Sequence, residues 1–462
     1  MSRVTKVRRA SPRAAAEPSC IVIGAGLAGL AAAYYLSSRK WKVTVLEAQS
    51  RFGGRVLSHR FAEAPDLVCE LGGEWIGANH KAIRRLCARL GLHLEAHSYG
   101  FTFWPGGPAD RSRVYRPGAW PFTRAAKREF DTFAGRFRRY SELQKRQLDQ
   151  IDWWTHLLNL KFTEQELLRR DLMDSTDFGE SIRMTSAYVA ATEYLSGDST
   201  DEMDFKVCGG NDRLTEALVA EIRSRGQAIW DRSPVTGVRQ FTRGVQVRVA
   251  TGRGPFAADY CICTIPARNL GKIHWSPALP AAQRQAADQL QYARIVKTAI
   301  LYNRRFWKTR YPYGFSTFTG RVSDFCFDST FAQVGECGIL CSYAIGDKAD
   351  DVAGEPDPSS VMRWITDDMT TIVKPDRQQL IAPIQIASQA WQKDVWTGGA
   401  YALYRPGQWF TVRRILQTRH RCVYFAGEHL AEWQGFMEGA VETGEAAAAA
   451  VHARVHRSVQ RH

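Results

Sequence analysis

The chain has 462 residues, of which 45% are hydrophobic, so it is long enough to form two compact domains with substantial cores. Lysine and arginine outnumber aspartate and glutamate by 62 to 47, which gives a formal net charge of +15. This charge is spread along the chain without any nucleic-acid recognition motif, and no apolar run is long enough to span a bilayer, so we expect neither a nucleic-acid partner nor a membrane anchor.

The N-terminal residues 1–19 are rich in Arg, Ala and Ser and contain a single acid. They lack the apolar core of a secretory signal, so a disordered basic tail is expected, with an organelle transit peptide as the alternative. The ten cysteines include no CxxC pair, and Cys261 and Cys263 alternate within an apolar strand. This usage favours a reducing compartment and a cytoplasmic protein, and it predicts no metal site.

A glycine-rich turn follows the tail. The apolar residues 20–23 lead into Gly-x-Gly-x-x-Gly at Gly24, Gly26 and Gly29, then into an Ala- and Leu-rich helix and a second apolar strand that ends at Glu47. The first glycine allows a tight turn, the second lets backbone approach a pyrophosphate, and the third lets helix pack on strand. The acid can accept hydrogen bonds from ribose hydroxyls, which disfavours NADP. The order of these elements favours a dinucleotide site over a ligand-free turn.

Two segments with paired glycines come next, at residues 51–56 and 71–77. Paired glycines let main chain lie against a flat ring and a diphosphate, while Arg51 and Arg55 can meet phosphate charge. Taken singly, each segment is equally well explained as a loop with solvated arginines. Their position directly after the ribose-binding acid favours the cofactor role.

The hydrophobic periodicity changes twice in the middle of the chain. Residues 122–200 show helical periodicity without alternation, which predicts the helical part of a substrate domain. After Gly209 a further helix is expected, and short alternating segments at 235–238, 245–249 and 260–266 predict β-strands. Strands and helices then alternate again as far as Ala390.

A lysine stands out in the strand predicted over residues 293–302. The period-two pattern places Lys297 on one face with Ile295, Ala299 and Leu301. A lysine on an apolar face is costly unless it is paired or functional. The alternative is an edge-strand lysine that prevents aggregation.

Two C-terminal segments complete the set of motifs. Residues 391–404 combine tryptophans with a glycine pair and a tyrosine. Residues 423–429 form a short apolar strand ending in Gly-Glu, and residues 433–445 lead into an alanine-rich helix.

Together these motifs resemble the flavin amine oxidase family, which includes monoamine oxidases, L-amino acid oxidases and polyamine oxidases. The resemblance implies an α/β chain with two domains. A Rossmann-like FAD-binding domain is expected from the discontinuous segments 20–95, 205–285 and 392–462, and a substrate domain of mixed sheet and helix from segments 96–204 and 286–391.

The resemblance also implies roles for single residues. Lys297 is expected to hydrogen-bond through a water to the flavin N5 atom, and Tyr401 and Phe436 are expected to face each other as a slot that aligns the amine. Aromatic faces attract an ammonium, and dehydration of the slot favours the neutral amine that reacts. The expected cofactor-binding residues are Gly24, Gly26, Gly29, Glu47, Arg55, Gly73, Glu74, Val235, Trp391, Gly427, Glu428 and Met437.

One position departs from part of the family. Monoamine oxidases that tether their flavin use a cysteine just before the first slot tyrosine, and this chain has Ala400 there. Thioether formation needs a sulfur nucleophile, so the FAD is expected to be non-covalent. At the second slot position, Phe436 replaces a common tyrosine and keeps the π-face.

The substrate class stays open between a monoamine and an L-amino acid. Many L-amino acid oxidases carry a carboxylate-binding arginine in a Gly-x-Met-Arg context, whereas residues 73–76 here are closer to monoamine oxidases. Arg405 shares a predicted strand face with Tyr401 and is a candidate partner for a carboxylate, with a solvated arginine as the alternative. An aromatic or bulky apolar substrate is expected from Trp75, Met203, Tyr401 and Phe436.

The expected reaction is oxidation of a primary amine to an imine, which water hydrolyses to a carbonyl compound and ammonia while O2 is reduced to H2O2. The partners are therefore a small amine or amino acid and O2, and a homo-oligomer remains open. Two alternatives share the N-terminal motif: a flavin-bearing interaction or demethylase-type protein, and a carotenoid-desaturase-like enzyme. The second would not require Lys297 or the aromatic slot.

Overall fold

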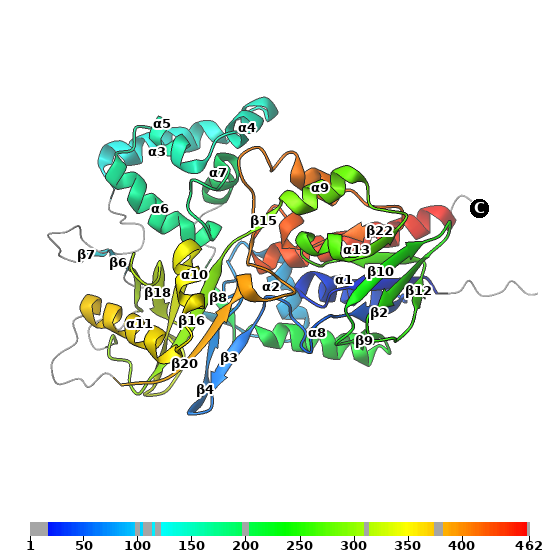
Figure 1. Ribbon diagram of the computed structural model, residues 1–462, viewed down its shortest axis with the longest axis horizontal. Coiled ribbons are helices and arrows are strands. Elements are labelled where there is room, and N and C mark those ends of the chain that lie inside the picture. Colours follow the sequence, from blue (N-terminus) through cyan, green and yellow to red (C-terminus); the bar gives the residue numbers. More distant parts are fainter. Residues whose placement is uncertain are drawn as a thin grey trace, which may run out of the picture.

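The computed structural model describes residues 17–97, 102–104, 113–115, 122–195, 203–308, 314–373 and 382–459. Residues 1–16 of the expected basic tail lie outside this set, and Ser19, which the prediction assigned to the tail, already belongs to the first strand, Ser19–Ile23. Within it the chain combines a parallel sheet, a larger mixed sheet and several groups of helices (Figure 1), which confirms the predicted α/β class with a Rossmann-like part and a mixed part.

The Rossmann-like part is built on a five-stranded parallel sheet. Its order is β22-β13-β1-β2-β9, so both ends of the chain contribute strands. The central strand β1 is almost wholly buried, as its unbroken apolar sequence requires in a parallel sheet covered on both faces. The strands are β1 (Ser19–Ile23), β2 (Lys42–Leu46), β9 (Ala228–Trp230), β13 (Tyr260–Cys263) and β22 (Val423–Phe425).

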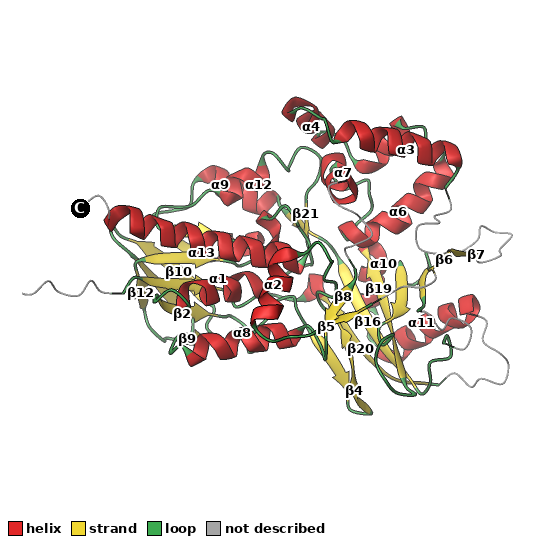
Figure 2. Cartoon of the chain, turned by 180° about the vertical axis from the view of Figure 1, so that it is seen from behind, coloured by secondary structure: helices red, strands yellow, loops and turns green. Residues whose placement is uncertain are grey.

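The first and last long helices cover one face of this sheet. Helix α1 (Leu27–Ser37) lies alongside α13 (Met437–Val459) in both views of the molecule (Figures 1 and 2). A Cβ on Gly444 would lie 2.1 Å from the carbonyl oxygen of Ala28, so only glycine permits this close helix contact. The N- and C-terminal segments therefore form one unit around the nucleotide motif.

A second, four-stranded sheet packs on the opposite side of the parallel sheet, where Val238 and Val247 join a core with Ile21. Its strands are β10 (Val235–Gln240), β11 (Val245–Val249), β12 (Phe256–Ala258) and β14 (His274–Ser276).

The mixed part is built on a seven-stranded sheet in the order β20-β16-β19-β18-β17-β6-β7, and α10 (Gly346–Gly354) and α11 (Pro358–Val373) contribute to the core beside it. Figure 1 shows these yellow helices next to the sheet. The strands are β6 (Thr102–Trp104), β7 (Arg113–Tyr115), β16 (Ile295–Tyr302), β17 (Ser316–Phe318), β18 (Phe325–Asp328), β19 (Gly338–Ile345) and β20 (Pro383–Ala390).

The helices predicted between residues 122 and 200 are present and form a cluster apart from the sheets (Figure 1). Their apolar faces meet around the buried Trp153 and Leu157. They are α3 (Arg124–Phe137), α4 (Glu142–Asp149), α5 (Trp153–Asn159), α6 (Glu164–Phe178) and α7 (Ala187–Leu195).

Shorter elements connect these parts. They are β3 (Ser58–Phe61), β4 (Ala64–Glu70), α2 (Lys81–Arg89), β5 (Leu94–Ala96), β8 (Phe205–Val207), α8 (Asp212–Ser224), α9 (Ala281–Gln289), β15 (Gln291–Tyr292), β21 (Ala402–Leu403) and α12 (Val412–Gln417). None of the helices in the described part of the chain has the length and apolar character needed to cross a membrane.

The strand that carries Lys297 differs from the simplest expectation. Strand β16 pairs with β19 on one side and β20 on the other, and all its residues are buried. The edge-strand interpretation of Lys297 is therefore wrong, because a central strand has no free edge to protect. Period-two alternation does not separate a buried face from an exposed face in β16, because apolar cores pack against both faces of the strand.

Candidate active site

A cavity of about 960 Å³ lies where the parallel sheet, the mixed sheet and the helical cluster meet. Residues from the nucleotide motif and from both C-terminal motifs border the same space. Of the predicted site residues, those that line it are Gly24, Gly26, Glu47, Arg55, Gly73, Glu74, Trp75, Met203, Val235, Lys297, Trp391, Tyr401, Gly427, Glu428, Phe436 and Met437.

The glycine-rich turn has the geometry that its sequence predicts. Gly24 adopts a φ of +98°, which favours glycine. Gly29 does not line the cavity, but a Cβ on it would lie 1.9 Å from the carbonyl oxygen of Gly24. Gly26 faces Gly54, whose Cα lies 3.9 Å from where a Gly26 Cβ would be. Side chains on these residues would displace the turn or fill the space in front of it.

The N-terminus of α1 is open to an anion. Its first turn contains no acidic residue, and Gly26, at the N-cap, supplies no side chain to bond the free N–H groups. Glu47 borders the same space and accepts hydrogen bonds from the backbone N–H groups of Ala25 at 2.7 Å and Gln49 at 2.8 Å. This carboxylate anchors the turn, while burial raises its pKa. Together the donors and the acid fit a diphosphate and a ribose.

Arg55 and Glu428 join the two ends of the chain. Arg55 Nη1 lies 2.8 Å from Glu428 Oε1. The same carboxylate accepts hydrogen bonds from the backbone N–H groups of Ala402 at 3.3 Å and Gly435 at 2.9 Å. Since these two residues are the chain neighbours of the predicted slot aromatics, Glu428 positions the backbone on both sides of the slot.

The two predicted slot aromatics line the cavity and are held by different contacts. The Tyr401 hydroxyl donates to the carbonyl oxygen of Thr176 at 2.8 Å. Phe436 packs edge-on against His80, with ring centroids 5.1 Å apart. One ring is therefore oriented by a hydrogen bond from its outer end and the other by packing alone.

Two further contacts shape the middle of the cavity. The indole N–H of Trp391 donates to the carbonyl oxygen of Leu71 at 2.9 Å, which orients this buried ring. A Cβ on Gly73 would lie 3.1 Å from Cγ of Met437, so the second glycine pair and the start of α13 are in close contact.

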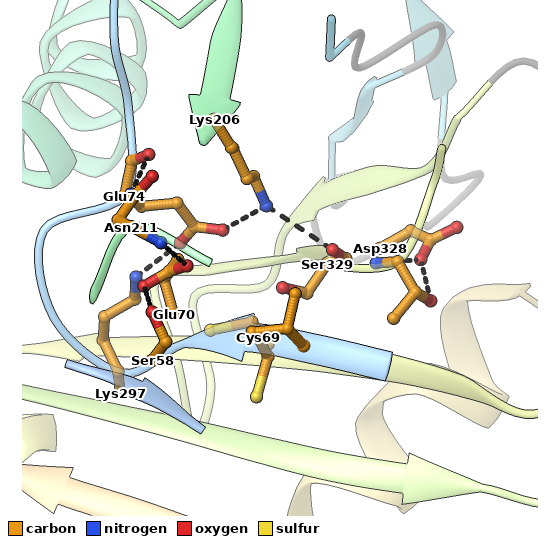
Figure 3. A network of polar contacts seen from close by, with 12 residues as sticks. Ser58, Cys69, Glu70, Glu74, Lys206, Asn211, Lys297, Asp328 and Ser329 are labelled. Carbon is orange, nitrogen blue, oxygen red and sulfur yellow. Dashed lines mark hydrogen bonds and ion pairs between the residues drawn. The ribbon is translucent and has the colours of Figure 1, made fainter. Parts of the chain in front are cut away.

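Lys297 is part of a buried group of three charges. Its Nζ lies 2.5 Å from Glu74 Oε2 and 3.1 Å from the carbonyl oxygen of Gly72. Glu74 Oε1 in turn lies 2.5 Å from Nζ of Lys206, so the carboxylate sits between two ammoniums (Figure 3). Burial opposes the charged form of Glu74, but the two lysines outweigh it and lower its pKa. Burial also opposes the charge of Lys297, and Glu74 more than compensates, so the pKa of Lys297 is raised.

Sequence reasoning missed Lys206. This lysine lies between Phe205 and Val207 in strand β8. A charged residue inside a short apolar strand is the same signal that singled out Lys297, so the sequence contained the clue. Its connection to Glu74, 132 positions away, depends on the fold.

Arg405 is the predicted substrate residue that the structure places elsewhere. Strand β21 ends at Leu403, so Arg405 does not continue the strand toward the cavity, and it is absent from the cavity lining. Its Nη2 instead lies 3.2 Å from the sulfur of Met184. The strand therefore ends before it reaches Arg405, contrary to the prediction, and Arg405 is not a substrate partner in this structure.

A different arginine, Arg170 of α6, lines the cavity. It is only 8% exposed, and its Nη2 lies 2.7 Å from Asp174 Oδ2. Its Nε has no hydrogen-bond partner among the described residues. The guanidinium is also surrounded by aromatic rings, among them Phe130 and Tyr194. A buried donor without a partner, beside a cavity, suits an acceptor group on a bound molecule.

Comparison with known proteins identifies relatives over nearly the whole chain. The family model described as "Flavin containing amine oxidoreductase" matches residues 27–452. An L-amino acid dehydrogenase from Synechocystis sp. is 24% identical, covering 94% of each chain. The flavin-containing amine oxidase A of Bos taurus is 26% identical over 93% of this chain and 84% of its own. Cyclohexylamine oxidase from Brevibacterium oxydans has a similar solved structure, with a TM-score of 0.82 and 21% identity over 95% of this chain and 100% of that one.

Proposed function

Because this chain belongs to the flavin containing amine oxidoreductase family, a family of FAD-dependent enzymes, we propose that it oxidises the amine-bearing carbon of a small amine with a bulky apolar substituent. The observation that carries this proposal is the shared cavity. The nucleotide cradle with Gly26 and Glu47 borders the same space as Lys297, Tyr401 and Phe436. A cofactor held by the first group therefore meets a substrate held by the second.

FAD bound in this cavity supplies the two-electron oxidation. The protein contributes binding, orientation and exclusion of water. Tyr401 and Phe436 offer aromatic faces that attract an approaching ammonium, and the apolar surroundings favour its neutral form, which carries the reactive lone pair. Lys297, held by Glu74, keeps its proton and offers N–H donors to a water at the cavity wall. No protein group is required as a strong base.

The overall reaction balances with O2 as the acceptor. The C–H and N–H bonds of the R2CH–NH2 group are oxidised to a C=NH bond, and O2 takes up the two electrons and two protons as H2O2. Water then adds to the imine and releases a carbonyl compound and ammonia.

Monoamines are the first substrate class. Besides the two slot aromatics, the cavity lining includes the aromatic residues Trp75, Phe327 and Tyr343. The similar proteins named amine oxidase A, from Bos taurus, and cyclohexylamine oxidase support this class.

L-Amino acids are the second class, and one observation favours them. Arg170 lines the cavity with an unbonded Nε, which is a suitable donor to a substrate carboxylate. The relative from Synechocystis sp. named as an L-amino acid dehydrogenase supports the same class.

The test uses the FAD-loaded protein and a panel of aromatic and alicyclic monoamines and L-amino acids. Anaerobic bleaching of the flavin absorbance measures amine oxidation, and H2O2 release in air measures the use of O2. We expect at least one class to bleach the flavin. In Arg170→Met, KM should rise for L-amino acids and stay unchanged for monoamines. If none of the monoamines and L-amino acids bleaches the flavin, the proposal is overturned.

A further inference from the structure

Lys206 is a buried cation that the proposed reaction does not use. It is 8% exposed, and its Nζ lies 2.5 Å from Glu74 Oε1 and 3.5 Å from the carbonyl oxygen of Ser329. The ammonium also lies 4.5 Å from the centre of the Trp75 ring. Figure 3 shows Lys206 and Lys297 reaching Glu74 from different strands. Among the residues that the structure describes, Lys206 thus has a single charged partner, which it shares with Lys297.

This sharing leaves an excess of positive charge. One carboxylate cannot neutralise two ammoniums, so Glu74, Lys206 and Lys297 together carry a net charge of +1. Burial of unbalanced charge is costly, and it is tolerated here because each ammonium has a close acceptor and aromatic faces nearby. Glu74 and Lys297 both border the cavity, so the excess charge lies at its wall.

Of the other titratable groups that interact with the three residues, Glu70 offsets this charge only in part, and His97, Cys69 and Cys341 contribute no negative charge. Glu70 is buried beside them, and burial raises its pKa to about 7, so it carries less than a full negative charge near neutrality. His97 is kept neutral because burial and the nearby Lys206 lower its pKa to about 2. Burial raises the pKa of the thiols of Cys69 and Cys341, which stay uncharged.

We propose that Lys206 tunes the charge beside Lys297. By sharing Glu74 with Lys297, it supplies the excess positive charge at the cavity wall formed by residues 72–74. That charge stabilises an electron-rich flavin ring bound beside this wall. The inference rests on FAD binding in this cavity and is independent of which amine is oxidised.

The test is a sulfite titration of the FAD-loaded protein. Sulfite is an anion that adds reversibly to oxidised flavins, and the loss of flavin absorbance measures its dissociation constant without any amine substrate. Lys206→Met removes the excess charge, so we expect the sulfite dissociation constant to rise about tenfold. Lys206→Arg keeps the charge and should restore sulfite binding to within about threefold of the wild type.

Lys348→Met is the matched control. Lys348 is also a partly buried lysine, 2.5 Å from its partner Asp324, but it does not border the cavity. Its loss should leave the dissociation constant unchanged. The proposal is overturned if Lys206→Met binds sulfite as tightly as the wild type and this control.

The double variant Glu74→Gln with Lys206→Met separates charge from structural damage. It removes one negative and one positive charge, so the net charge of +1 is retained on Lys297. Its sulfite dissociation constant should return to the wild-type value, while Glu74→Gln alone should bind sulfite more tightly than the wild type. If Lys206→Met does not retain FAD, the double variant tests the proposal in its place. A sulfite dissociation constant of the double variant that differs from the wild-type value would then overturn the proposed role of charge.

Discussion

Lys297 and Glu74 are 223 positions apart in the sequence, and their charged groups meet at 2.5 Å inside the molecule. The second oxygen of Glu74 is held equally closely by Lys206. Loss of either lysine therefore leaves the carboxylate paired. Loss of the carboxylate leaves two buried ammoniums with no other anionic partner within bonding distance among the described residues.

Lys297→Met is expected to slow turnover by about 100-fold or more without releasing FAD. The substitution removes the N–H donors that the proposal directs toward a water at the cavity wall, while Glu74 stays paired with Lys206, so the local structure should be preserved. Turnover with the best substrate and the ratio of flavin to protein absorbance are the measurements. Lys348→Met serves as the control, and unchanged turnover in Lys297→Met would rule out the proposed role.

Glu74→Gln is expected to lower the free energy of unfolding by about 3–5 kcal/mol, because breaking a buried ion pair from one side leaves uncompensated charge. Lys206→Met and Lys297→Met should each cost clearly less. Urea denaturation of the FAD-saturated proteins gives the comparison. If all three variants lose the same free energy of unfolding, the loss of Glu74 is no more costly than the loss of either lysine, and the prediction is wrong.

Tyr401→Phe and Tyr401→Ala are expected to differ strongly. The first loses the hydrogen bond to the Thr176 carbonyl oxygen, a contribution of about 1 kcal/mol to stability, but keeps the aromatic face. The second removes the face and should raise KM about tenfold or more. Tyr302→Phe, which loses a bond to Thr366 in the core beside the mixed sheet, is the control for loss of a hydroxyl. Equal KM values for Tyr401→Phe and Tyr401→Ala would contradict the proposed role of the Tyr401 ring in binding the amine.

Acid precipitation is expected to leave the yellow flavin in the supernatant. Ala400, which borders the cavity beside Tyr401, has no sulfur to form a thioether. Absorbance of the supernatant and pellet after precipitation measures the distribution. Colour retained in the pellet would show a covalent link at another residue.

Glu70 is expected to make stability depend on pH. Burial raises its pKa from an ordinary value of 4.5 to about 7, so between these values the folded protein binds more protons than the unfolded chain. Stability therefore falls as pH rises through this window, and the loss is complete above about pH 7. Glu70→Gln should flatten the change in Tm between pH 5 and pH 8. Glu164→Gln, at an exposed glutamate, should retain the wild-type slope, and an unaltered slope in Glu70→Gln would contradict the assignment.

The residues that sequence reasoning placed well belong to motifs with short-range geometry. The turn at Gly24 and Gly29 requires particular backbone angles and close contacts within a few positions, and Glu47 follows the next strand at a set spacing. The helical periodicity between residues 122 and 200 is likewise a local property, and the helices are present. The proposed domain boundaries, the oligomeric state and the non-covalent attachment of FAD stay predictions.

The amino-acid sequence alone determined the fold class, the nucleotide turn and the family resemblance, because each depends on residue types at short spacings along the chain. Only the tertiary structure decided that Glu74 is shared by Lys206 and Lys297, that Arg170 enters the cavity, and that Arg405 lies outside it. The physical reason is that an ionic partner is selected by the packing of distant strands and helices. Periodicity along one strand carries no information about which charge that packing brings within reach.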